Sequence, residues 1–256
     1  IGFNNVRIDL MYRFPDQTLD RLKDDLENFI QLDPDGISTY SLEIEGLPFM
    51  KKIPELPSDK LDKEMFYYIG EFLTKNGYIR YAQPDFSKPG KEDKYVLNSW
   101  KAPQQLMLGF GAGAHTHYFG GHIYVNVCSV KRYIEAIEDG YFPVILGQSL
   151  TKEDLMAKYM VLGVRCLYID KIKFKKYFGI EILRKFNKQI NELLKKGWLK
   201  DIGNYYEIAD IGLWYIDNIS KTFYSKANIN ERQPRGKKLS NYNNITLYKR
   251  IRAKGV

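Results

Sequence analysis

Cysteine is scarce in this sequence, and its scarcity limits the kinds of site that the chain can carry. Only Cys128 and Cys166 occur among 256 residues, and they lie far apart. This spacing excludes a CxxC motif, a zinc ribbon and a disulfide framework. Apolar runs of membrane-spanning length are also missing, as is a basic segment followed by an apolar stretch at the amino terminus. We therefore expect a cytoplasmic protein without a membrane partner.

Acidic residues are scarce near the carboxyl terminus, where the net positive charge of the chain is concentrated. The formal charge is +8, and residues 231–256 hold eight Lys and Arg side chains against one acid. The rest of the chain is therefore close to neutral, which argues against a broad nucleic-acid-binding surface. We expect residues 230–256 to form a solvated basic tail. Docking of this tail on RNA or on an acidic partner is the alternative.

The opening stretch predicts a strand that delivers an acid into a loop. Asp9 is the one carboxylate within the largely apolar residues 6–11, and Pro15 lies in a turn before Thr18, a good helix N-cap. Ligands bind beyond the carboxyl ends of parallel strands. Because we expect this strand to be central, a charge at Asp9 needs a partner, such as ligand hydroxyls or an ammonium group. The alternative is that Asp9 caps the next helix or pairs with a lysine.

A unit of strand, loop and helix is predicted to repeat through the first half of the chain. A second helix begins after Ser58, and residues 105–114 predict a short buried strand that leads into a glycine-rich turn. Strand ends recur at intervals of roughly 30 to 40 residues, the length of one such unit, at Asp9, Tyr40, Tyr81 and Leu108. The pattern predicts part of a parallel α/β barrel or an open sheet, which we assign to residues 1–126.

The glycine-rich turn matches a nucleotide-binding fingerprint only in part. Gly109, Gly111 and Gly113 are present, but Ala114 occupies the third glycine position of GxGxxG and no helix is predicted directly afterwards. We therefore expect the turn to allow close approach of a ligand to the backbone rather than to bind a dinucleotide.

Acids and histidines near the predicted strand ends are the other candidates for chemistry. Glu43 and Glu45 lie near the end of the second predicted strand, over 37–45, and are either general acid and base groups or solvated loop acids. His115 and His117 alternate, so they would share one face of a strand, and His122 follows them. Metal ligation is chemically possible there, but no carboxylate or thiolate lies nearby in the sequence. We assign no metal ligand and no catalytic residue.

The second half of the chain predicts helices with short connectors. A helix begins at Ser129 and ends near Gly140, and Thr151 with Asp154 predicts a capping box. The segments that follow are a helix over 182–197, a hairpin over 198–208 and a closing helix over 211–223. This arrangement resembles a winged-helix variant without a basic recognition helix, so we expect a structural role. We assign residues 127–229 to a helical accessory domain.

Several blocks of the sequence resemble, in the same order, the oxygen-independent coproporphyrinogen III oxidase family of radical S-adenosylmethionine (SAM) proteins. The string IDLMYRFPDQT at 8–18 resembles the family segment DLIYGLPxQT. The further blocks are PDGISTYSLEIEGLPF at 34–49, LTKNGYIRYAQPDFSKPG at 73–90 and LGFGAGAHTHYFGGHIYVN at 108–126. FGI at 178–180 and KKGWL at 195–199 are similar to the family's accessory domain. Several blocks in register are far more specific than any one motif.

The resemblance implies an α/β fold: a partial parallel (β/α) barrel of radical SAM type, followed by a mainly helical carboxyl-terminal domain with a small winged-helix-like hairpin. SAM would bind at the carboxyl ends of the strands. The acid of the family's first block contacts the bound nucleoside, which corresponds to Asp9, and Met11 lies beside it. The strand before Glu43 passes the adenine, and His115 approaches the same ligand.

The sequence also departs from the family. The CxxxCxxC motif, whose thiolates hold a [4Fe-4S] cluster, has no counterpart here. We expect it to lie before Ile1, together with the turn that binds the methionine part of SAM, and this chain alone to be inactive. Arg13 stands where the family has Gly, and Tyr95 and Val96 replace the His-Asn pair of the heme-chaperone branch, which argues against heme ligation.

The function implied by the resemblance is that of a radical SAM enzyme. It would form a 5'-deoxyadenosyl radical that acts on a tetrapyrrole or related ring substrate, with an electron donor protein as partner. The alternatives are a heme chaperone or heme-binding protein of the same fold, and a radical SAM methyltransferase that uses a second cofactor molecule.

Overall fold

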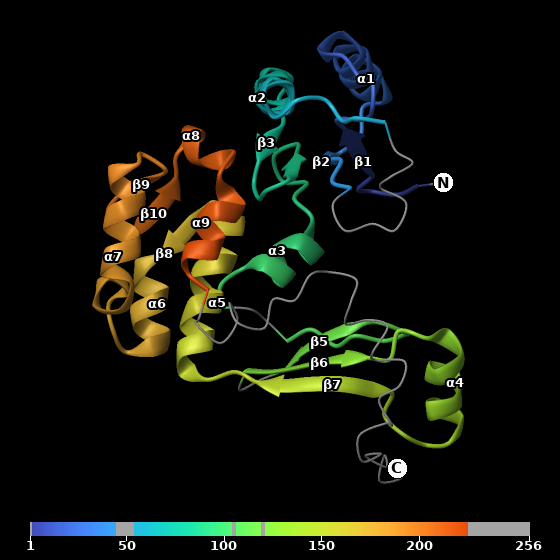
Figure 1. Cartoon of the computed structure of the whole chain (residues 1–256), viewed down its shortest axis with the longest axis vertical. Coiled ribbons are helices and arrows are strands. Elements are labelled where there is room, and N and C mark those ends of the chain that lie inside the picture. Colours follow the sequence, from blue (N-terminus) through green and yellow to red (C-terminus); the bar gives the residue numbers. More distant parts are fainter. Residues whose placement is uncertain (1, 45–53, 104–105, 119–120, 225–256) are drawn as a thin grey trace.

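The computed structural model of the chain describes residues 2–44, 54–103, 106–118 and 121–224 (Figure 1). Within these residues, strands form one mixed sheet and two antiparallel sheets. The mixed sheet has the order β1-β2-β4-β3. Its strands are β1 (Arg7–Tyr12), β2 (Gly36–Ser41), β3 (Ile79–Arg80) and β4 (Asp85–Ser87). β1 and β2 run parallel, as the sequence predicts, with Ile8 opposite Ile37.

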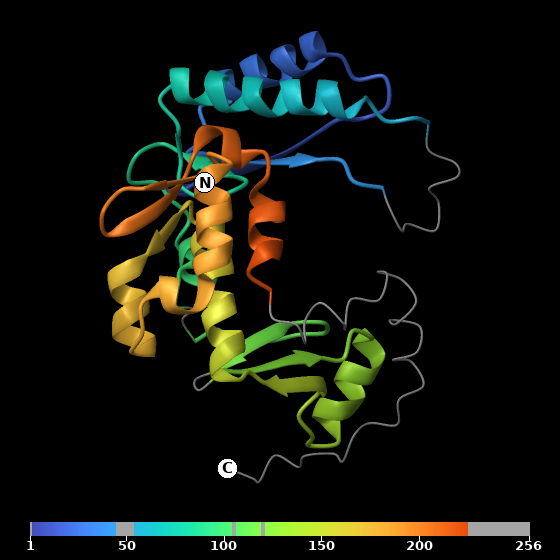
Figure 2. The same cartoon turned by 60° about the vertical axis from the view of Figure 1, so that its left-hand side comes forward.

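Two amphipathic helices cover one face of this sheet, α1 (Leu19–Leu32) and α2 (Asp59–Lys75). Figure 2 shows them side by side over the strands. Thr18 and Ser58 cap them as predicted, because each hydroxyl accepts a hydrogen bond from a backbone N–H of the first turn. The buried core beneath the helices consists of Tyr12, Leu22, Leu26, Phe29, Ile37, Met65, Ile69, Leu73, Tyr78 and Phe86.

The predicted series of parallel strands is interrupted after β2. The third predicted strand appears as Ile79–Arg80 at the sheet edge, where it runs parallel to β2 but is separated from it by the antiparallel β4. The fourth, at 105–114, is not a buried strand where it is described. Leu106 and Leu108 are exposed, and Met107 forms an isolated bridge to His117.

An antiparallel sheet of order β5-β6-β7 follows, and the sequence did not predict it. Its strands are β5 (His115–Tyr118), β6 (His122–Asn126) and β7 (Val144–Ser149). The short helix α3 (Lys94–Trp100) precedes the sheet, and α4 (Val130–Glu138), which begins at the predicted cap Ser129, connects β6 to β7. Polar and glycine residues in VILGQS weaken the apolar signal of β7, which explains why it was missed.

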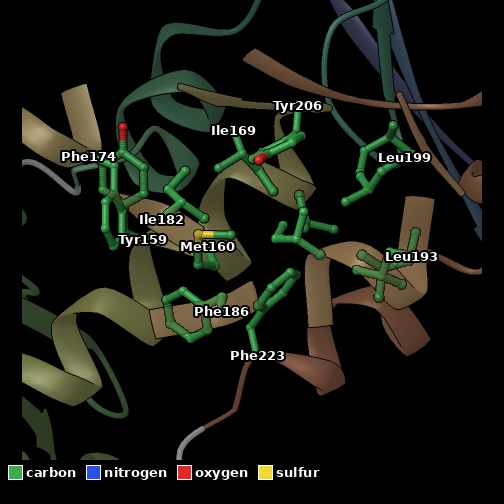
Figure 3. Close-up of a cluster of buried hydrophobic side chains, with 14 of the residues drawn as sticks. Tyr159, Met160, Ile169, Phe174, Ile182, Phe186, Leu193, Leu199, Tyr206 and Phe223 are labelled. Carbon is green, nitrogen blue, oxygen red and sulfur yellow. The ribbon is translucent and has the colours of Figure 1, made fainter. Parts of the chain in front are cut away.

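The last part of the chain is mainly helical and contains the largest apolar cluster of the described residues (Figure 3). The helices are α5 (Lys152–Arg165), α6 (Lys171–Phe178), α7 (Ile182–Lys195), α8 (Asp210–Leu213) and α9 (Ile216–Thr222). The small antiparallel sheet β8-β10-β9 consists of β8 (Tyr168–Asp170), β9 (Leu199–Asp201) and β10 (Tyr205–Ile208). Tyr159, Phe174 and Phe186 meet in this core. The predicted hairpin is confirmed as β9 and β10.

Two local predictions in this part have different outcomes. The capping box is confirmed, since Thr151 and Asp154 exchange side-chain and backbone hydrogen bonds at the start of α5. The prediction of a single closing helix is wrong, because the helix is interrupted between α8 and α9. The break lets the Tyr215 ring stack on Trp198 at a centroid distance of 4.4 Å.

The helical part packs against the edge of the mixed sheet and α2. Phe66 of α2 meets Trp214 at a ring centroid distance of 5.3 Å, and the Gln83 N–H donates to the Arg165 carbonyl at 2.9 Å. Within the described ranges, no helix is long and apolar enough to cross a membrane. The domain boundaries at 126 and 229 stay predictions, and the basic tail at 230–256 lies outside the described residues.

Candidate functional site

The candidate site is the face of the mixed sheet that points away from α1 and α2. Alternation along β1 places Ile8, Leu10 and Tyr12 toward the helices, which leaves Asp9 and Met11 on the opposite face. Because β1 and β2 are parallel and in register, Ser38 lies beside Asp9 and Tyr40 lies beside Met11.

Asp9 is exposed on this face, so within the described residues its charge is not buried as expected. In the sheet formed by the described residues, β1 is an edge strand. Within the same residues, the Asp9 carboxylate has no hydrogen-bond or ion-pair partner, so it neither caps α1 nor pairs with a lysine. Met11 and Tyr40 are also exposed beside it. The arrangement offers a free carboxylate next to thioether and aromatic surface.

A buried polar pair supports the sheet next to Asp9. The Ser38 hydroxyl donates a hydrogen bond of 2.7 Å to Asp85 on β4. Burial raises the pKa of Asp85, while the hydrogen bond from Ser38 and the charge of Arg7 oppose this shift. Burial also raises the pKa of Tyr40. The hydrogen bond between Ser38 and Asp85 fixes β2 against β4 next to Asp9 and does not involve the Asp9 carboxylate.

Arg7 spans the amino-terminal end of the same face. Its guanidinium donates to the Tyr81 hydroxyl at 3.0 Å and to the Phe86 carbonyl at 2.9 Å. The absence of a Cβ at Gly36 gives the Arg7 guanidinium its space, because a Cβ at this position would displace it. Arg7 therefore ties β1 to β4 across β2.

The turn after β1 keeps a left-handed backbone despite the replacement of glycine by arginine. Arg13 has a φ of 66° and its guanidinium lies 2.9 Å from Asp62 and 2.7 Å from Asp59. These ion pairs offset the strain of a positive φ in a residue that carries a Cβ. The Ser41 hydroxyl also contacts the Asp62 carboxylate at 3.0 Å. The turn is thus fixed by α2.

The other predicted cofactor residues lie elsewhere. Glu43 is exposed just beyond β2, and its charge adds to burial in raising the pKa of Asp62. Glu45 lies outside the described residues. His115 is exposed at the start of β5, in a different sheet from Asp9. Asp9 and Met11 thus share one face of β1, whereas Glu43 follows β2 and His115 belongs to another sheet. The roles of these residues toward a cofactor stay predictions.

The glycine-rich turn packs against its own sheet. A Cβ at Gly109 would meet the His115 backbone. The Asn126 side chain donates to the carbonyls of Gly109 and Gly111 at 3.1 and 3.0 Å, and the Gly109 N–H donates to Thr116 at 2.8 Å. The close approach at Gly109 is to β5, and Gly111 and Gly113 have positive φ values of 100° and 72°. These features explain the glycine pattern without a nucleotide.

Sequence reasoning missed Lys158, which lies in the middle of α5. Its Nζ is 2.8 Å from Nδ1 of His117 on β5. His115 and His117 share one face of β5, as their alternation predicts. No local signal could have revealed the contact, because the two residues are separated by 41 positions and belong to different elements.

The two cysteines do not fit an iron–sulfur cluster. Cys128 is exposed, whereas burial raises the pKa of the Cys166 thiol to about 11, which disfavours the thiolate that would bind iron. In the described part of the chain, no group of three or more His, Cys, Asp or Glu side chains could hold a metal ion. The open sheet face does fit SAM, because the carboxylate oxygens of Asp9 have no partner among the described residues and can accept hydrogen bonds from hydroxyl groups.

Comparisons with known proteins agree with this architecture. Residues 150–215 match the HemN C-terminal domain. The chain is 32% identical to heme chaperone HemW of Bacillus subtilis, covering 77% of this chain and 53% of that protein. Identity to HemW of Lactococcus lactis is 30%, with 87% and 59% covered. Identity to oxygen-independent coproporphyrinogen III oxidase of Helicobacter pylori is 24%, with 87% and 52% covered.

A solved structure shows the same fold. Coproporphyrinogen III oxidase (HemN) from Escherichia coli, described as a radical SAM enzyme, superposes with a TM-score of 0.73 at 21% identity, over 88% of this chain and 56% of that one. The chain thus spans a little over half the length of these proteins. The resemblance carried by the sequence blocks is confirmed, and the chain belongs to the oxygen-independent coproporphyrinogen III oxidase-like family.

Proposed function

We propose that this chain contributes the nucleoside-contacting part of a radical SAM enzyme that acts on a tetrapyrrole or related ring. The observation that carries the proposal is the free carboxylate of Asp9 beside Met11 and Tyr40 on the open sheet face. Support comes from the family membership and from the radical SAM relative of the same fold. The proposal includes an electron donor protein as partner and a cytoplasmic location.

The chemistry of the open face suits a nucleoside. A carboxylate accepts hydrogen bonds from two neighbouring hydroxyls, and charge-assisted bonds of this kind are stronger than neutral ones. Met11 and Tyr40 offer apolar and aromatic contact for a purine ring. SAM reduced by a [4Fe-4S] cluster supplies a 5'-deoxyadenosyl radical for hydrogen abstraction. We place the cluster ligands outside this chain, because its two cysteines do not fit them.

Binding of SAM tests the role of Asp9 directly. Asp9→Asn should weaken SAM binding about 10- to 100-fold, because a hydrogen bond to a charged group contributes about 1.5 to 3 kcal/mol. Isothermal titration calorimetry on this chain measures the change. The matched control is Asp24→Asn, because Asp24 is exposed on α1, away from the site. Equal affinities of wild type and Asp9→Asn would contradict the assignment.

The reaction is tested in the protein that carries this chain together with cluster ligands. After anaerobic reconstitution with iron and sulfide, a reductant should release 5'-deoxyadenosine from SAM. The product is measured by liquid chromatography with and without a porphyrinogen substrate. Absence of SAM cleavage with every reductant tried would overturn the enzymatic proposal.

A heme chaperone is the second candidate, and it is favoured by the two HemW relatives at 32% and 30% identity. The absent His-Asn pair at Tyr95 and Val96 argues the other way. A heme titration followed by absorbance separates the candidates. Saturable, stoichiometric heme binding without SAM cleavage would favour the chaperone, whereas SAM cleavage coupled to turnover of the ring substrate would favour the enzyme.

A further inference from the structure

A side-chain contact joins α5 to β5, and a third basic residue lies next to it. Lys158 of α5 lies 2.8 Å from His117, measured between Nζ and Nδ1. His115 lies two positions earlier on the same face of β5, and it is exposed, so the group is open to solvent on that side. Two backbone hydrogen bonds between His117 and Met107 fix the position of β5 at this point.

Positive charge in this group has no acidic counterpart. Burial lowers the pKa of Lys158 to about 8, and no carboxylate counters this shift. Burial, then the charges of Lys158 and His115, lower the pKa of His117 to about 4. At pH 7 the lysine is therefore mostly charged, and neutral His117 accepts a hydrogen bond from it. Among the described residues, Lys158 takes part in no ion pair with an acid.

Aliphatic surface borders the basic group on the same face of the sheet. Val125 lies opposite His115 and Ile123 lies opposite His117, and both are only partly buried. Leu146 on β7 pairs with Val125 and is exposed. A site that joins an unpaired lysine and imidazoles to an apolar strip matches a ligand that is itself apolar with an acidic edge.

We propose that Lys158, His117 and His115 form a binding site for a carboxylate group at the edge of an apolar ring ligand. This inference rests on the proposed function in one respect, because the ring substrate named there would be the source of the carboxylate. Lys158 donates to the carboxylate and His115 supplies the solvent-facing contact, while Ile123 and Val125 cover the adjoining edge of the ring. β5 and Asp9 belong to different sheets.

Coproporphyrin III, which carries propionates, is the probe, and its uncharged methyl ester is the comparison ligand. Lys158→Met should weaken coproporphyrin binding at least 10-fold, measured by fluorescence quenching, and should leave binding of the ester unchanged. Lys152→Met is the matched control, because Lys152 is exposed on the same helix. Lys158→Arg keeps the charge and should retain most of the affinity. Equal coproporphyrin affinity of wild type and Lys158→Met would overturn the proposal.

A second measurement keeps the inference separable from the proposed function. Sodium propionate should shift the imidazole resonances of His115 and His117 saturably in the NMR spectrum of the whole chain, and the shifts should vanish in Lys158→Met. Inorganic phosphate should give much smaller shifts, and equal shifts would overturn the assignment to a carboxylate. If neither porphyrin binds but propionate does, the ring substrate fails while the carboxylate site stands. Absence of any propionate shift removes the site itself.

Discussion

Arg13 and Asp62 form an ion pair across the end of the parallel strand pair, with Nη1 of the arginine 2.9 Å from a carboxylate oxygen. Asp62 is buried in α2, and Arg13 has the positive φ that normally selects glycine. A glycine would adopt this backbone conformation without strain. Here the ion pair with α2 stabilises the strained turn after β1 instead. This matters for function because the turn directly follows Asp9 and Met11.

The first prediction concerns this pair. Arg13→Gly relieves a backbone strain of about 1–2 kcal/mol, but it leaves the buried Asp62 carboxylate without its cation, which costs about 3–5 kcal/mol. We expect a net destabilisation of about 1–4 kcal/mol in the free energy of unfolding, measured by urea denaturation. Asp59→Asn is the control and should change stability little, because the Asp59 side chain is 92% exposed. A Gly variant as stable as wild type would refute the compensation.

The second prediction tests the close approach of Arg7 to Gly36. Gly36→Ala places a methyl group where the guanidinium lies. The flexible Arg7 side chain can move aside only by giving up its hydrogen bonds to Tyr81 and Phe86, so we expect a loss of about 1–3 kcal/mol in the free energy of unfolding. The double variant Arg7→Ala with Gly36→Ala removes the collision. Its destabilisation should be smaller than the sum of the two single losses, as measured in a double-mutant cycle by chemical denaturation. Additive losses would show that the two residues do not compete for this space.

The extent to which this molecule could be predicted from its sequence follows the range of each interaction. Helix starts depend on a hydroxyl and a backbone N–H a few residues away, so the caps at Thr18, Ser58, Ser129 and Thr151 were predicted correctly. The parallel pair and the hairpin were also predictable, because apolar alternation and turn residues are local signals. The family blocks then supplied the fold, which no local pattern contains.

Features that depend on long-range pairing were not predictable. β4 has three residues, too few for a periodic signal, yet it displaces β3 from the neighbourhood of β2. The exposure of Asp9 depends on which strands flank β1, and the apolar neighbours of Asp9 in the sequence do not contain this information. The contact of Lys158 with His117 joins helix α5 to strand β5 across 41 positions of the sequence. Periodicity cannot reveal such a contact.

The third prediction is a loss of stability in acid that depends on His117. In the unfolded chain, His117 takes up a proton as the pH falls below 6.5. In the folded chain, burial and the neighbouring charges lower the pKa of His117 to about 4. Between these values the unfolded chain binds more protons, so stability falls as the pH falls. Lys158, with a lowered pKa of about 8, is charged in both states throughout this window and adds no slope there.

The change is measured as the difference between wild type and His117→Asn, because other titrating groups then cancel. We expect wild type to lose about 1–2 kcal/mol more than the variant between pH 7 and pH 4.5, after discounting for partial exposure of the ring. Thermal or urea unfolding at both pH values gives the two differences. Parallel curves for the two proteins would show that His117 titrates normally in the folded state.

The fourth prediction concerns the packing of the glycine-rich turn on β5. Gly109→Ala directs a methyl group into the His115 backbone, which cannot move aside as a flexible side chain would. We expect β5 to shift, with a loss of about 1–3 kcal/mol in stability and a rise in the pKa of His117 toward its ordinary value as its contact with Lys158 loosens. Gly147→Ala is the matched control in the same sheet, since a Cβ there meets its neighbours at 3.5 Å, an ordinary contact distance. Unfolding experiments give the stability of both variants, and NMR titration of His117 gives the pKa. Two results would contradict the view that the turn positions β5 against α5. One is a His117 pKa in Gly109→Ala equal to that of wild type, and the other is an ordinary histidine pKa for His117 in the control Gly147→Ala.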